Sequence, residues 1–430
     1  LNRRILQQCG ELVDFAIMNE GSWPTPPTTP TSPTNAASFS TRLSQIDGST
    51  SKSLMSLMQT DAIKVCVRVR PLSARELENN ERVCVRIPPE APHSTTVMMF
   101  NPHDLSHTKN YSFDRAYWSV KASDEHFASQ DTIMDDLGAE LRAHVMDGYN
   151  ACLFAYGQTG SGKTYTVLGH ESPAEQAGLL PRIAEDIFTR IPELRNSTNE
   201  FSVTISYLEI YNEQIRDLLV SPEEPRYKLE VRAHPKFGNF VFGVKEVPVM
   251  DWPNTKAWLD FGVKSRAVAC TSMNATSSRS HCIFSMEIVH KIWNSGNRTQ
   301  LRSKVKVVDL AGSERQKKSQ TSGSRLKEGA MVNQSLSNLS LVISRLAFLA
   351  KNINKENKKN ALDFIPFRNS KLTFLLEDSL RGNSKTAMIA ALSPAGSDYD
   401  ETTSTLQFAQ HVKAVKTQAK KHLNQEDHVL

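Results

Sequence analysis

The stretch AYGQTGSGKTYTV, residues 155–167, limits the possible folds of this chain more than any other segment. It fits the pattern G-x-x-x-x-G-K-[ST], which binds nucleotide phosphates when an apolar strand precedes it and a helix follows it. The apolar run NACLFAYG comes before it, and KTYTV has the composition of a helix start. Gly160 and Gly162 let the backbone turn its amides inward, and a helix amino end adds partial positive charge. The sequence therefore predicts a triphosphate site.

This loop predicts roles for its side chains. Lys163 is expected to reach the β and γ phosphates, and Thr164 is expected to hold Mg²⁺. The alternative, a glycine-rich turn without a ligand, is disfavoured by the flanking strand and helix. GTPases, transporters and helicases carry the same loop, so it does not identify the class of protein. The residues predicted to bind nucleotide are Gly157, Gln158, Thr159, Gly160, Ser161, Gly162, Lys163 and Thr164.

Strand-like runs alternate with helix-like segments from residue 61 onward. Several runs are continuously apolar, as expected of strands that are covered on both faces. The alternation predicts an α/β sheet with helices on both sides. The expected strands are AIKVCVRVRP, NACLFAYG, VTISYLEIY, CIFSMEIV, VKVVDLAG and TAMIAALSP, and the expected helices are residues 132–148, 178–191, 333–350 and 370–381.

Composition excludes several classes of protein. A net charge of +5 over 430 residues is too small to diagnose a nucleic-acid binder, although clustered lysines could dock on an acidic surface. No run approaches the ~20 apolar residues of a membrane helix. The cysteines form no CxxC pair and no zinc spacing, so we expect buried free thiols in a reducing compartment, the cytoplasm. They are Cys9, Cys66, Cys84, Cys152, Cys270 and Cys282.

Residues 1–60 differ in composition and residue pattern from the rest of the chain. Apolar residues at helical spacing predict a short amphipathic helix over 1–20, which docks either on this chain or on a partner. Residues 21–40 are rich in proline and small hydroxyl residues and predict an extended linker. Because the chain starts with Leu1 and stops just after a basic stretch, we expect it to be a piece of a longer polypeptide.

Two further motifs suit contact with a terminal phosphate. NATSSRSH, residues 274–281, forms a polar turn before a strand, as expected of a mobile loop. DLAGSER, residues 309–315, follows the run VKVV, so Asp309 lies at the carboxyl end of a strand, where α/β sheets place ligand chemistry. Asp309 can hold the Mg²⁺ shell, and Gly312 lets the backbone approach a phosphate closely.

The phosphate loop, NATSSRSH and DLAGSER, in this order, resemble the three nucleotide motifs of the kinesin motor domain. The resemblance runs from about residue 61 to about residue 424 and includes RVRP near its start and LEIYNEQIRDLL in its middle. It implies a three-layer P-loop NTPase fold, with a central mixed β-sheet and helices on both faces. It also implies ATP and Mg²⁺ as cofactors.

The resemblance implies further roles around the nucleotide. Ser278 would join Thr164 around Mg²⁺, and Asp309 would act on the metal through water. Arg279 and Glu314 would form an ion pair that closes the pocket and positions the attacking water, whereas the alternative is an ordinary surface pair. The implied catalytic residues are Lys163, Ser278, Arg279, Asp309, Gly312 and Glu314, and those implied to border the adenine are Arg68, Arg70, Pro71 and Tyr165.

In kinesins the segment after DLAGSER contains the loop and long helix that lie against the microtubule. Basic residues there suit the acidic tubulin surface, and binding through them should weaken with salt because the Debye length is ~8 Å at physiological ionic strength. The alternative for any one of them is a solvated surface lysine. The implied microtubule-binding residues are Lys317, Lys318, Arg325, Lys327, Lys355, Lys358, Lys359, Arg368 and Lys371.

The resemblance also divides the chain into an N-terminal extension (1–60), a motor domain (61–414) and a neck linker with the start of the neck (415–430). A neck linker docks along the sheet when ATP closes the pocket, and Asn424 is a candidate latch. The motifs look most like the third kinesin class, the organelle transporters. Gln334 and Ser340 depart from that class, which usually has a lysine and a glycine there.

These features predict a microtubule-stimulated ATPase of the cytoplasm and cytoskeleton that moves toward the plus end. Cargo or an adaptor, and the second chain of a possible dimer, would bind through regions outside this sequence, and neither nucleic-acid binding nor membrane insertion is expected. A non-motile microtubule-binding protein is disfavoured by the complete catalytic set. A P-loop GTPase is disfavoured because no guanine-reading N-K-x-D stretch is found, and a depolymerase is disfavoured by the neck linker.

Overall fold

The computed structural model describes residues 61–426, apart from 91–92, 103, 222, 225–226, 235–237, 273–276, 295–296, 315–323 and 353–364. The chain divides into two units, Leu1–Gln59 and Thr60–Leu430, and the fold described below belongs to the second. The helix expected over 1–20 and the linker expected over 21–40 lie outside the described residues.

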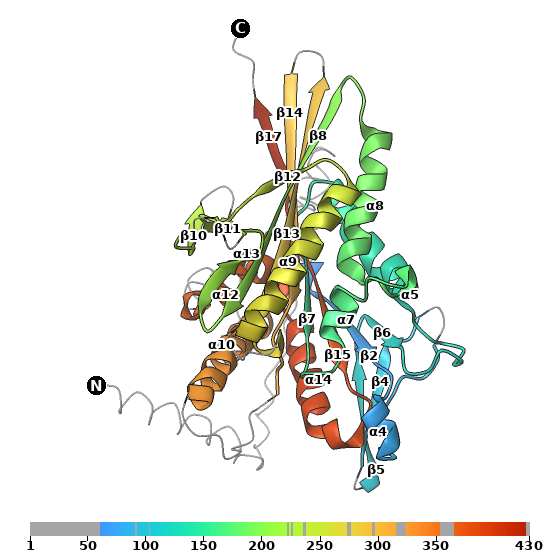
Figure 1. Cartoon of the computed structure of the whole chain (residues 1–430). Helices are drawn as coiled ribbons and strands as arrows, with labels where there is room; N and C mark the ends of the chain where they lie inside the picture. The colour runs from blue at the N-terminus through green and yellow to red at the C-terminus, as the bar shows by residue number, and fades with distance from the viewer. Residues whose placement is uncertain are drawn as a thin grey trace, which may run out of the picture. The chain divides into compact units, whose positions relative to one another are not determined.

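A ten-stranded sheet forms the centre of this unit (Figure 1). Strands β14, β7, β15, β2 and β6 pair in parallel, whereas β12, β8, β13 and β14 pair antiparallel. All six strands expected from the sequence are present, and the mixed α/β sheet is confirmed. In spatial order the main path is β12 (Val247–Val249), β8 (Asn199–Tyr211), β13 (His281–Asn294), β14 (Asn297–Asp309), β7 (Ala151–Tyr156), β15 (Lys385–Leu392), β2 (Lys64–Val69) and β6 (Arg115–Trp118).

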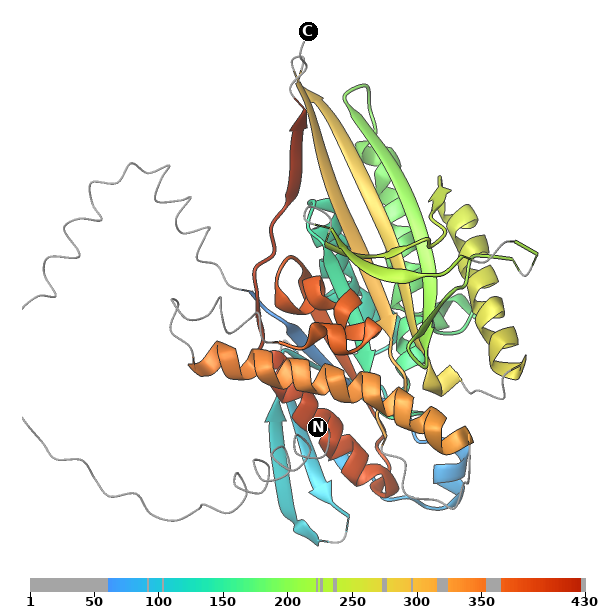
Figure 2. The same ribbon diagram turned by 90° about the vertical axis from the view of Figure 1, so that its left-hand side faces the viewer.

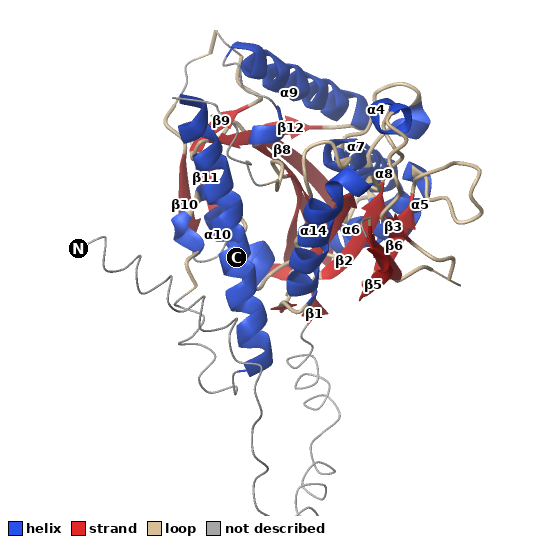
Figure 3. Ribbon diagram, turned by 90° about the horizontal axis from the view of Figure 1, so that it is seen from below, coloured by secondary structure: helices blue, strands red, loops and turns tan. Residues whose placement is uncertain are grey.

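Side chains alternate between the two faces of the sheet, as the period of two in a strand requires. Val65, Val67 and Phe154 pack into one core, whereas their neighbours Cys66 and Leu153 pack into the other. Figure 2 shows α10 and α14 in front of the sheet, and Figure 3 shows α9 and α10 on opposite sides of the strands.

Helices cover both faces, as the sequence predicted. One face carries α10 (Ser324–Asn352), α12 (Lys371–Leu375), α13 (Glu377–Arg381) and α14 (Tyr399–Lys413). The other carries α5 (Gln130–Ile133), the π-helical turn η2 (Met134–Gly138), α6 (Ala139–Met146), α7 (Lys163–Val167), α8 (Leu179–Leu194) and α9 (Trp252–Ser272). A small sheet of β3 (Val85–Arg86), β4 (Thr96–Asn101) and β5 (Asp104–Ser112) and a hairpin of β10 (Glu230–His234) and β11 (Gly238–Phe242) lie outside the main sheet.

Strand β14 changes its partner along its length. Residues 305–309 pair with β7, and residues 298–302 pair antiparallel with β17 (His422–Glu426). β17 therefore extends the sheet beyond the end of β7, as Figures 1 and 2 show. Before it, β16 (Lys416–Thr417) pairs with β1 (Asp61–Ala62). We call residues 416–426 the C-terminal strap.

The cysteines agree with the sequence prediction. Cys66, Cys84, Cys152 and Cys282 are buried free thiols, and burial raises the pKa of Cys66 to about 12. Cys9 and the side chain of Cys270 lie outside the described residues. No helix in the described part of the chain is both long and apolar enough to cross a membrane.

Helix α10 is held on the sheet by its apolar side, where Leu339 is fully buried. Leu339→Ala should lower the free energy of unfolding by about 2–5 kcal/mol, because the lost methyl groups leave a cavity. Leu341→Ala is the matched control, because Leu341 is 41% exposed on the same helix, and it should cost less than about 1 kcal/mol. Urea unfolding measures both values, and equal losses would contradict this packing.

Candidate active site

The predicted phosphate loop joins β7 to α7. β7 is buried along its whole length, and α7 begins at Lys163 after Gly162, whose φ of 99° is left-handed. Gly157 has a φ of 149°, and a Cβ there would lie 2.3 Å from the carbonyl oxygen of Ala391. Glycine is therefore required at 157 both by the backbone conformation and by the close approach of β15.

Lys163 is a buried cation inside this loop. It is 6% exposed, and its Nζ donates to the carbonyl oxygens of Gly157 and Gln158 at 2.8 Å each. Burial lowers the pKa of Lys163, whereas the nearby carboxylates of Asp309 and Glu314 act in the opposite direction. A positive charge held by carbonyl dipoles at the centre of a loop favours an anionic ligand.

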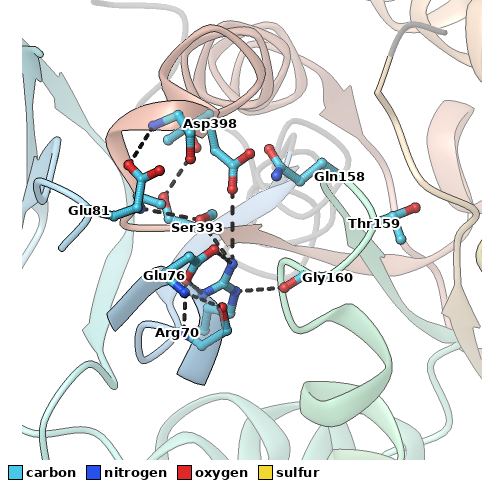
Figure 4. Close-up of polar contacts among 12 residues, drawn as sticks. Arg70, Glu76, Glu81, Gln158, Thr159, Gly160, Ser393 and Asp398 are labelled. Atoms are coloured by element: carbon cyan, nitrogen blue, oxygen red, sulfur yellow. Dashed lines mark hydrogen bonds and ion pairs between the residues drawn. The ribbon is translucent and has the colours of Figure 1, made fainter. Parts of the chain in front are cut away.

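Arg70 fixes the shape of the phosphate loop, as the close-up in Figure 4 shows. Its Nε donates to the carbonyl oxygen of Gly160 at 2.6 Å, and its two Nη atoms bind the carboxylate of Glu76 at 2.7 and 2.6 Å. The same guanidinium donates to Ser393 Oγ at 3.0 Å and lies 4.0 Å from the Asp398 carboxylate. Arg70 thus ties the loop to the segment between β15 and α14.

Glu76 is itself held in place by the start of α4 (Ala74–Glu78). Its Oε2 accepts from the backbone N–H of Ser73 at 2.7 Å, and Ser73 Oγ accepts from the N–H of Glu76 at 3.3 Å. This capping box aims the carboxylate at Arg70. The hydrogen bonds from Arg70 lower the pKa of Glu76 to about 2. The pair therefore stabilises the fold above the usual carboxyl pKa, and this contribution is lost as the pH falls toward 2.

Arg68 lies behind the loop and is only 5% exposed. Its guanidinium donates to Gln130 Oε1 at 2.7 Å, to Ser119 Oγ at 3.0 Å and to Thr166 Oγ1 at 3.1 Å, and it lies 5.2 Å from the centre of the Tyr165 ring. Burial lowers the pKa of Arg68 to about 10. These contacts join β2 to α5 and α7. An adenine contact by Arg68, Arg70, Pro71 or Tyr165 remains a prediction.

Asp309 brings together residues from three elements at the end of β14. It is 3% exposed, and its Oδ2 accepts from Thr164 Oγ1 at 2.8 Å and from Arg266 Nη1 at 3.1 Å. Thr164 and Asp309 are two of the residues that the sequence placed around Mg²⁺, and they are in contact. Arg266, on α9, was not predicted, because a single arginine within a helix carries no signal of a distant buried partner.

The segment after Asp309 is bound through three consecutive backbone amides. Each amide donates to a different element, so this segment joins the phosphate loop, the turn η4 (Ser277–Arg279) and β13. The pairs are Ala311 with His281 Nδ1 (3.0 Å), Gly312 with the Ser278 carbonyl (2.8 Å) and Ser313 with the Gly157 carbonyl (3.0 Å).

His281 continues this connection to α10. It is 2% exposed, and its Nε2 lies 2.7 Å from Ser335 Oγ. Burial, and then the charges of Arg266 and Lys163, lower the pKa of His281 to about 3, so the ring is neutral. Nδ1 accepts from Ala311, so Nε2 carries the proton and donates to Ser335. The sequence placed His281 in a phosphate-sensing motif but did not predict this bridge.

Glu314 lies against the phosphate loop. Its carboxylate accepts from the backbone N–H of Thr159 at 2.7 Å and from Thr159 Oγ1 at 2.5 Å. A Cβ at Gly312 would lie 2.3 Å from Glu314 Oε2 and from Thr159 Oγ1, so a larger residue there would have to displace this hydrogen-bonded pair. Ser278 and Arg279 are half-buried and lie in η4, which comes just before β13 in the sequence. The ion pair of Arg279 with Glu314 remains a prediction.

The site fits a magnesium nucleotide. Within the described residues, Ser161 Oγ, Gln158 Oε1 and Asp309 Oδ1 are buried and have no hydrogen-bond partner. A phosphate oxygen or a metal-bound water would satisfy such groups, which otherwise cost free energy. The described residues contain no cluster of three or more His, Cys, Asp or Glu side chains suited to a metal. Mg²⁺ is usually held by one or two carboxylates, waters and substrate phosphates, and Asp309 in contact with Thr164 would suit such a site.

The structure describes only some of the residues that the resemblance implies bind the microtubule. Lys317, Lys318, Lys355, Lys358 and Lys359 lie outside the described residues, and Arg325 and Lys327 lie on α10 with only their backbone described. Arg368 is exposed, and its guanidinium lies 5.1 Å from the Phe374 ring. Lys371 begins α12, and its backbone N–H donates to Glu213 Oε2 at 2.8 Å. α12 packs against α10.

Comparison with known proteins places this geometry in a family. The family model described as the kinesin motor domain matches residues 68–415. Kinesin-like protein KIF1A of Rattus norvegicus is 43% identical over 364 residues, which are 83% of this chain and 21% of that protein. Kinesin-like protein unc-104 of Caenorhabditis elegans is 42% identical over 361 residues, again 83% of this chain and 22% of that protein. The chain thus spans about a fifth of the length of these curated relatives.

Two solved structures of kinesins resemble this chain in fold and in sequence. One is a KIF14 dimer in a two-heads-bound state, with AMP-PNP and in complex with a microtubule; it has a TM-score of 0.74, 38% identity, and 84% and 96% coverage of this chain and that chain. The other is described as a fast kinesin, with a TM-score of 0.73, 34% identity, and 86% and 96% coverage.

His281→Ala should destabilise the protein by about 2–4 kcal/mol, because it leaves a cavity and two buried polar groups without partners. His411→Ala, at an exposed position of α14, is the control and should cost less than about 0.5 kcal/mol. The folded pKa of His281 is far below its unfolded value of about 6.5, so its contribution is complete above that value and is lost as the pH falls. Urea unfolding at pH 7 and pH 5 should therefore show a smaller difference between wild type and His281→Ala at pH 5.

Proposed function

The chain belongs to the family of kinesin motor domains, and on this basis we propose that it is an ATP-driven motor that moves along microtubules. Its relatives, including KIF1A and unc-104, agree with the third kinesin class that the motifs resemble. The enzyme activity proposed is microtubule-stimulated hydrolysis of ATP. Movement toward the plus end is part of the proposal, because the strap that would act as neck linker follows the motor domain.

One observation carries this proposal. The three amides of residues 311–313 bind the phosphate loop, η4 and His281, and His281 binds α10. If a terminal phosphate displaced this segment, the hydrogen bonds through His281 would therefore change the position of α10. A buried polar segment with several simultaneous hydrogen bonds favours discrete positions over gradual drift, and a nucleotide-dependent change is amplified by such an element.

The residues of the pocket supply positioning and charge, which are what phosphoryl transfer needs most. Lys163 would exchange its two loop carbonyls for the β and γ phosphates. Thr164 and Ser278 would hold Mg²⁺ directly and Asp309 would hold it through water, and the ion would neutralise charge that develops on the phosphates. Glu314, with Arg279, would release Thr159 and orient the attacking water.

Microtubule binding is proposed for the basic residues before, on and after α10. Arg368 and Lys371 are the described members of this set, and they flank the start of α12, beside α10. Electrostatic attraction of this kind raises association rates and falls steeply with ionic strength. Salt dependence is therefore part of the proposal.

The strap is proposed to be the neck linker, with the motor domain ending near residue 414. Its residues 422–426 pair with β14, with the backbone of Asn424 opposite Gln300, which agrees with a latch at this position. Eleven residues that swing between free and docked positions would move an attached load by tens of ångströms, since extended chain spans ~3.3–3.6 Å per residue. Cargo, an adaptor or a second chain would attach beyond this sequence, in the cytoplasm.

Steady-state nucleotide hydrolysis with and without microtubules, at low and moderate salt, tests the proposal. We expect a rate increase of at least tenfold with microtubules at low salt, a smaller increase at higher salt, and a preference for ATP over GTP. Equal rates with and without microtubules would remove the motor function. Hydrolysis stimulated by microtubules without directed gliding would favour the non-motile alternative.

Glu314→Ala should abolish microtubule-stimulated hydrolysis, a loss of at least 100-fold, because the attacking water loses the group that orients it. Binding of fluorescent ATP and microtubule co-sedimentation should persist within a few-fold of wild type. Glu193→Ala, at an exposed position of α8, is the matched control and should leave the rate unchanged. Ordinary stimulated turnover in Glu314→Ala would contradict the role given to this carboxylate.

A further inference from the structure

His422 is the first residue of β17 and binds two asparagines that belong to the sheet. Its Nε2 lies 3.2 Å from Asn150 Nδ2 and 2.6 Å from Asn383 Nδ2, and its backbone N–H donates to the Gly148 carbonyl at 3.3 Å. Asn150 precedes β7, and Asn383 precedes β15. A single imidazole nitrogen of the strap therefore reaches the start of two central strands.

The orientation of both amides is fixed by other hydrogen bonds. Asn150 Oδ1 accepts from the backbone N–H of Lys304 at 3.0 Å, and Asn383 Oδ1 accepts from the backbone N–H of Lys420 at 2.7 Å. Each amide must therefore present its NH₂ group to His422, since a flip would place NH₂ against a backbone N–H. His422 Nε2 faces two donors and must be an unprotonated acceptor, with the ring proton on Nδ1.

Protonation of this ring is opposed by its surroundings as a whole. Burial lowers the pKa of His422, the Arg302 guanidinium acts in the same direction, and the Asp378 carboxylate acts in the opposite direction. The polar cavity beneath the ring is lined on β14 by Arg302, Lys304 and Lys306 and on the other elements by Glu287 and Asp378. An imidazolium would place an N–H against two N–H donors, next to a cavity in which Glu287 is already paired with Arg302 and Lys304.

We propose that His422 is a positioning residue that anchors the C-terminal strap on the sheet only as a neutral imidazole, so that acidification releases the strap. The proposal deepens the neck-linker function and rests on it. Loss of the neutral form removes both side-chain hydrogen bonds of the ring at once, and the strap then keeps its backbone hydrogen bonds there, which include those from Lys420 to Asn383 and from His422 to Gly148. Motor output would fall in acid even where nucleotide binding persists.

The sign of the effect follows from linkage. A free strap has a histidine pKa of about 6.5, and the docked strap has a lower one. Docking is therefore fully supported above that value and weakens as the pH falls through it. Between pH 7.5 and pH 5.5 the docking equilibrium should fall by up to about tenfold, since a free imidazole changes from mostly neutral to mostly charged.

A spin label on the strap tests this proposal with the whole chain. The label is attached at Leu423→Cys, which is 53% exposed beside His422, after Cys9→Ser and Cys270→Ser; a control label at Leu77→Cys, 60% exposed on α4, reports on the domain itself. The immobile fraction is measured with Mg²⁺ and AMP-PNP at pH 7.5 and 5.5, in wild type, His422→Gln and His422→Leu. Glutamine keeps an oxygen acceptor without titrating, whereas leucine removes the acceptor.

We expect the strap label to become more mobile at pH 5.5 in wild type, to be independent of pH in His422→Gln, and to be mobile at both pH values in His422→Leu. The proposal is overturned if His422→Gln responds like wild type, if the wild-type label does not change with pH, if it is mobile at both values, or if the Leu77 label changes in parallel. The measurement uses neither microtubules nor turnover. Failure of microtubule stimulation at pH 7.5 would therefore contradict the motor function separately.

Discussion

Three adjacent backbone amides, at residues 311–313, are the contacts on which the rest of the site depends. They donate to the imidazole of His281, to the turn η4 and to the phosphate loop. Buried amides cost free energy when they lack partners, so none of the three contacts can be given up cheaply. The segment can change position only if new partners replace the old ones together. This constraint makes it a relay between a small pocket and a long helix.

Strand β14 gives this relay its frame. It carries Asp309 at one end, next to the phosphate loop, and pairs with the strap at residues 298–302. At ~3.3 Å per residue, the two regions lie roughly 20–35 Å apart along one strand. Because β14 is paired with other strands on both of its edges, it bends little and transmits little movement from the phosphate loop to the strap. The strap therefore depends mainly on the residues that it touches directly, which include Asn150, just before β7, and Asn383, before β15.

The sequence predicted the parts of this structure that depend on local pattern. Strand-like apolar patterns, several of them continuous runs, identified six strands, and the spacing of Gly157, Gly162, Lys163 and Thr164 identified the phosphate loop, because these signals lie within a few neighbouring residues. Contacts between distant residues could not be read in this way. Arg70 reaches Gly160 across 90 residues, and Arg266 reaches Asp309 across 43. The strap has no alternating pattern in KHLNQED, so its pairing with β14 depends on partners that the sequence does not reveal.

The buried charged side chains of this pocket have partners that keep them ordered even without a ligand. Lys163, Arg266 and Asp309 are each less than a tenth exposed, and an isolated charge in such a place would be costly. Arg266 pairs with Asp309, and the loop carbonyls solvate Lys163, so each has a partner before any phosphate arrives. A phosphate would add charge complementarity to groups that are already ordered. The free energy of binding is then available for moving residues 311–313 rather than for building the site.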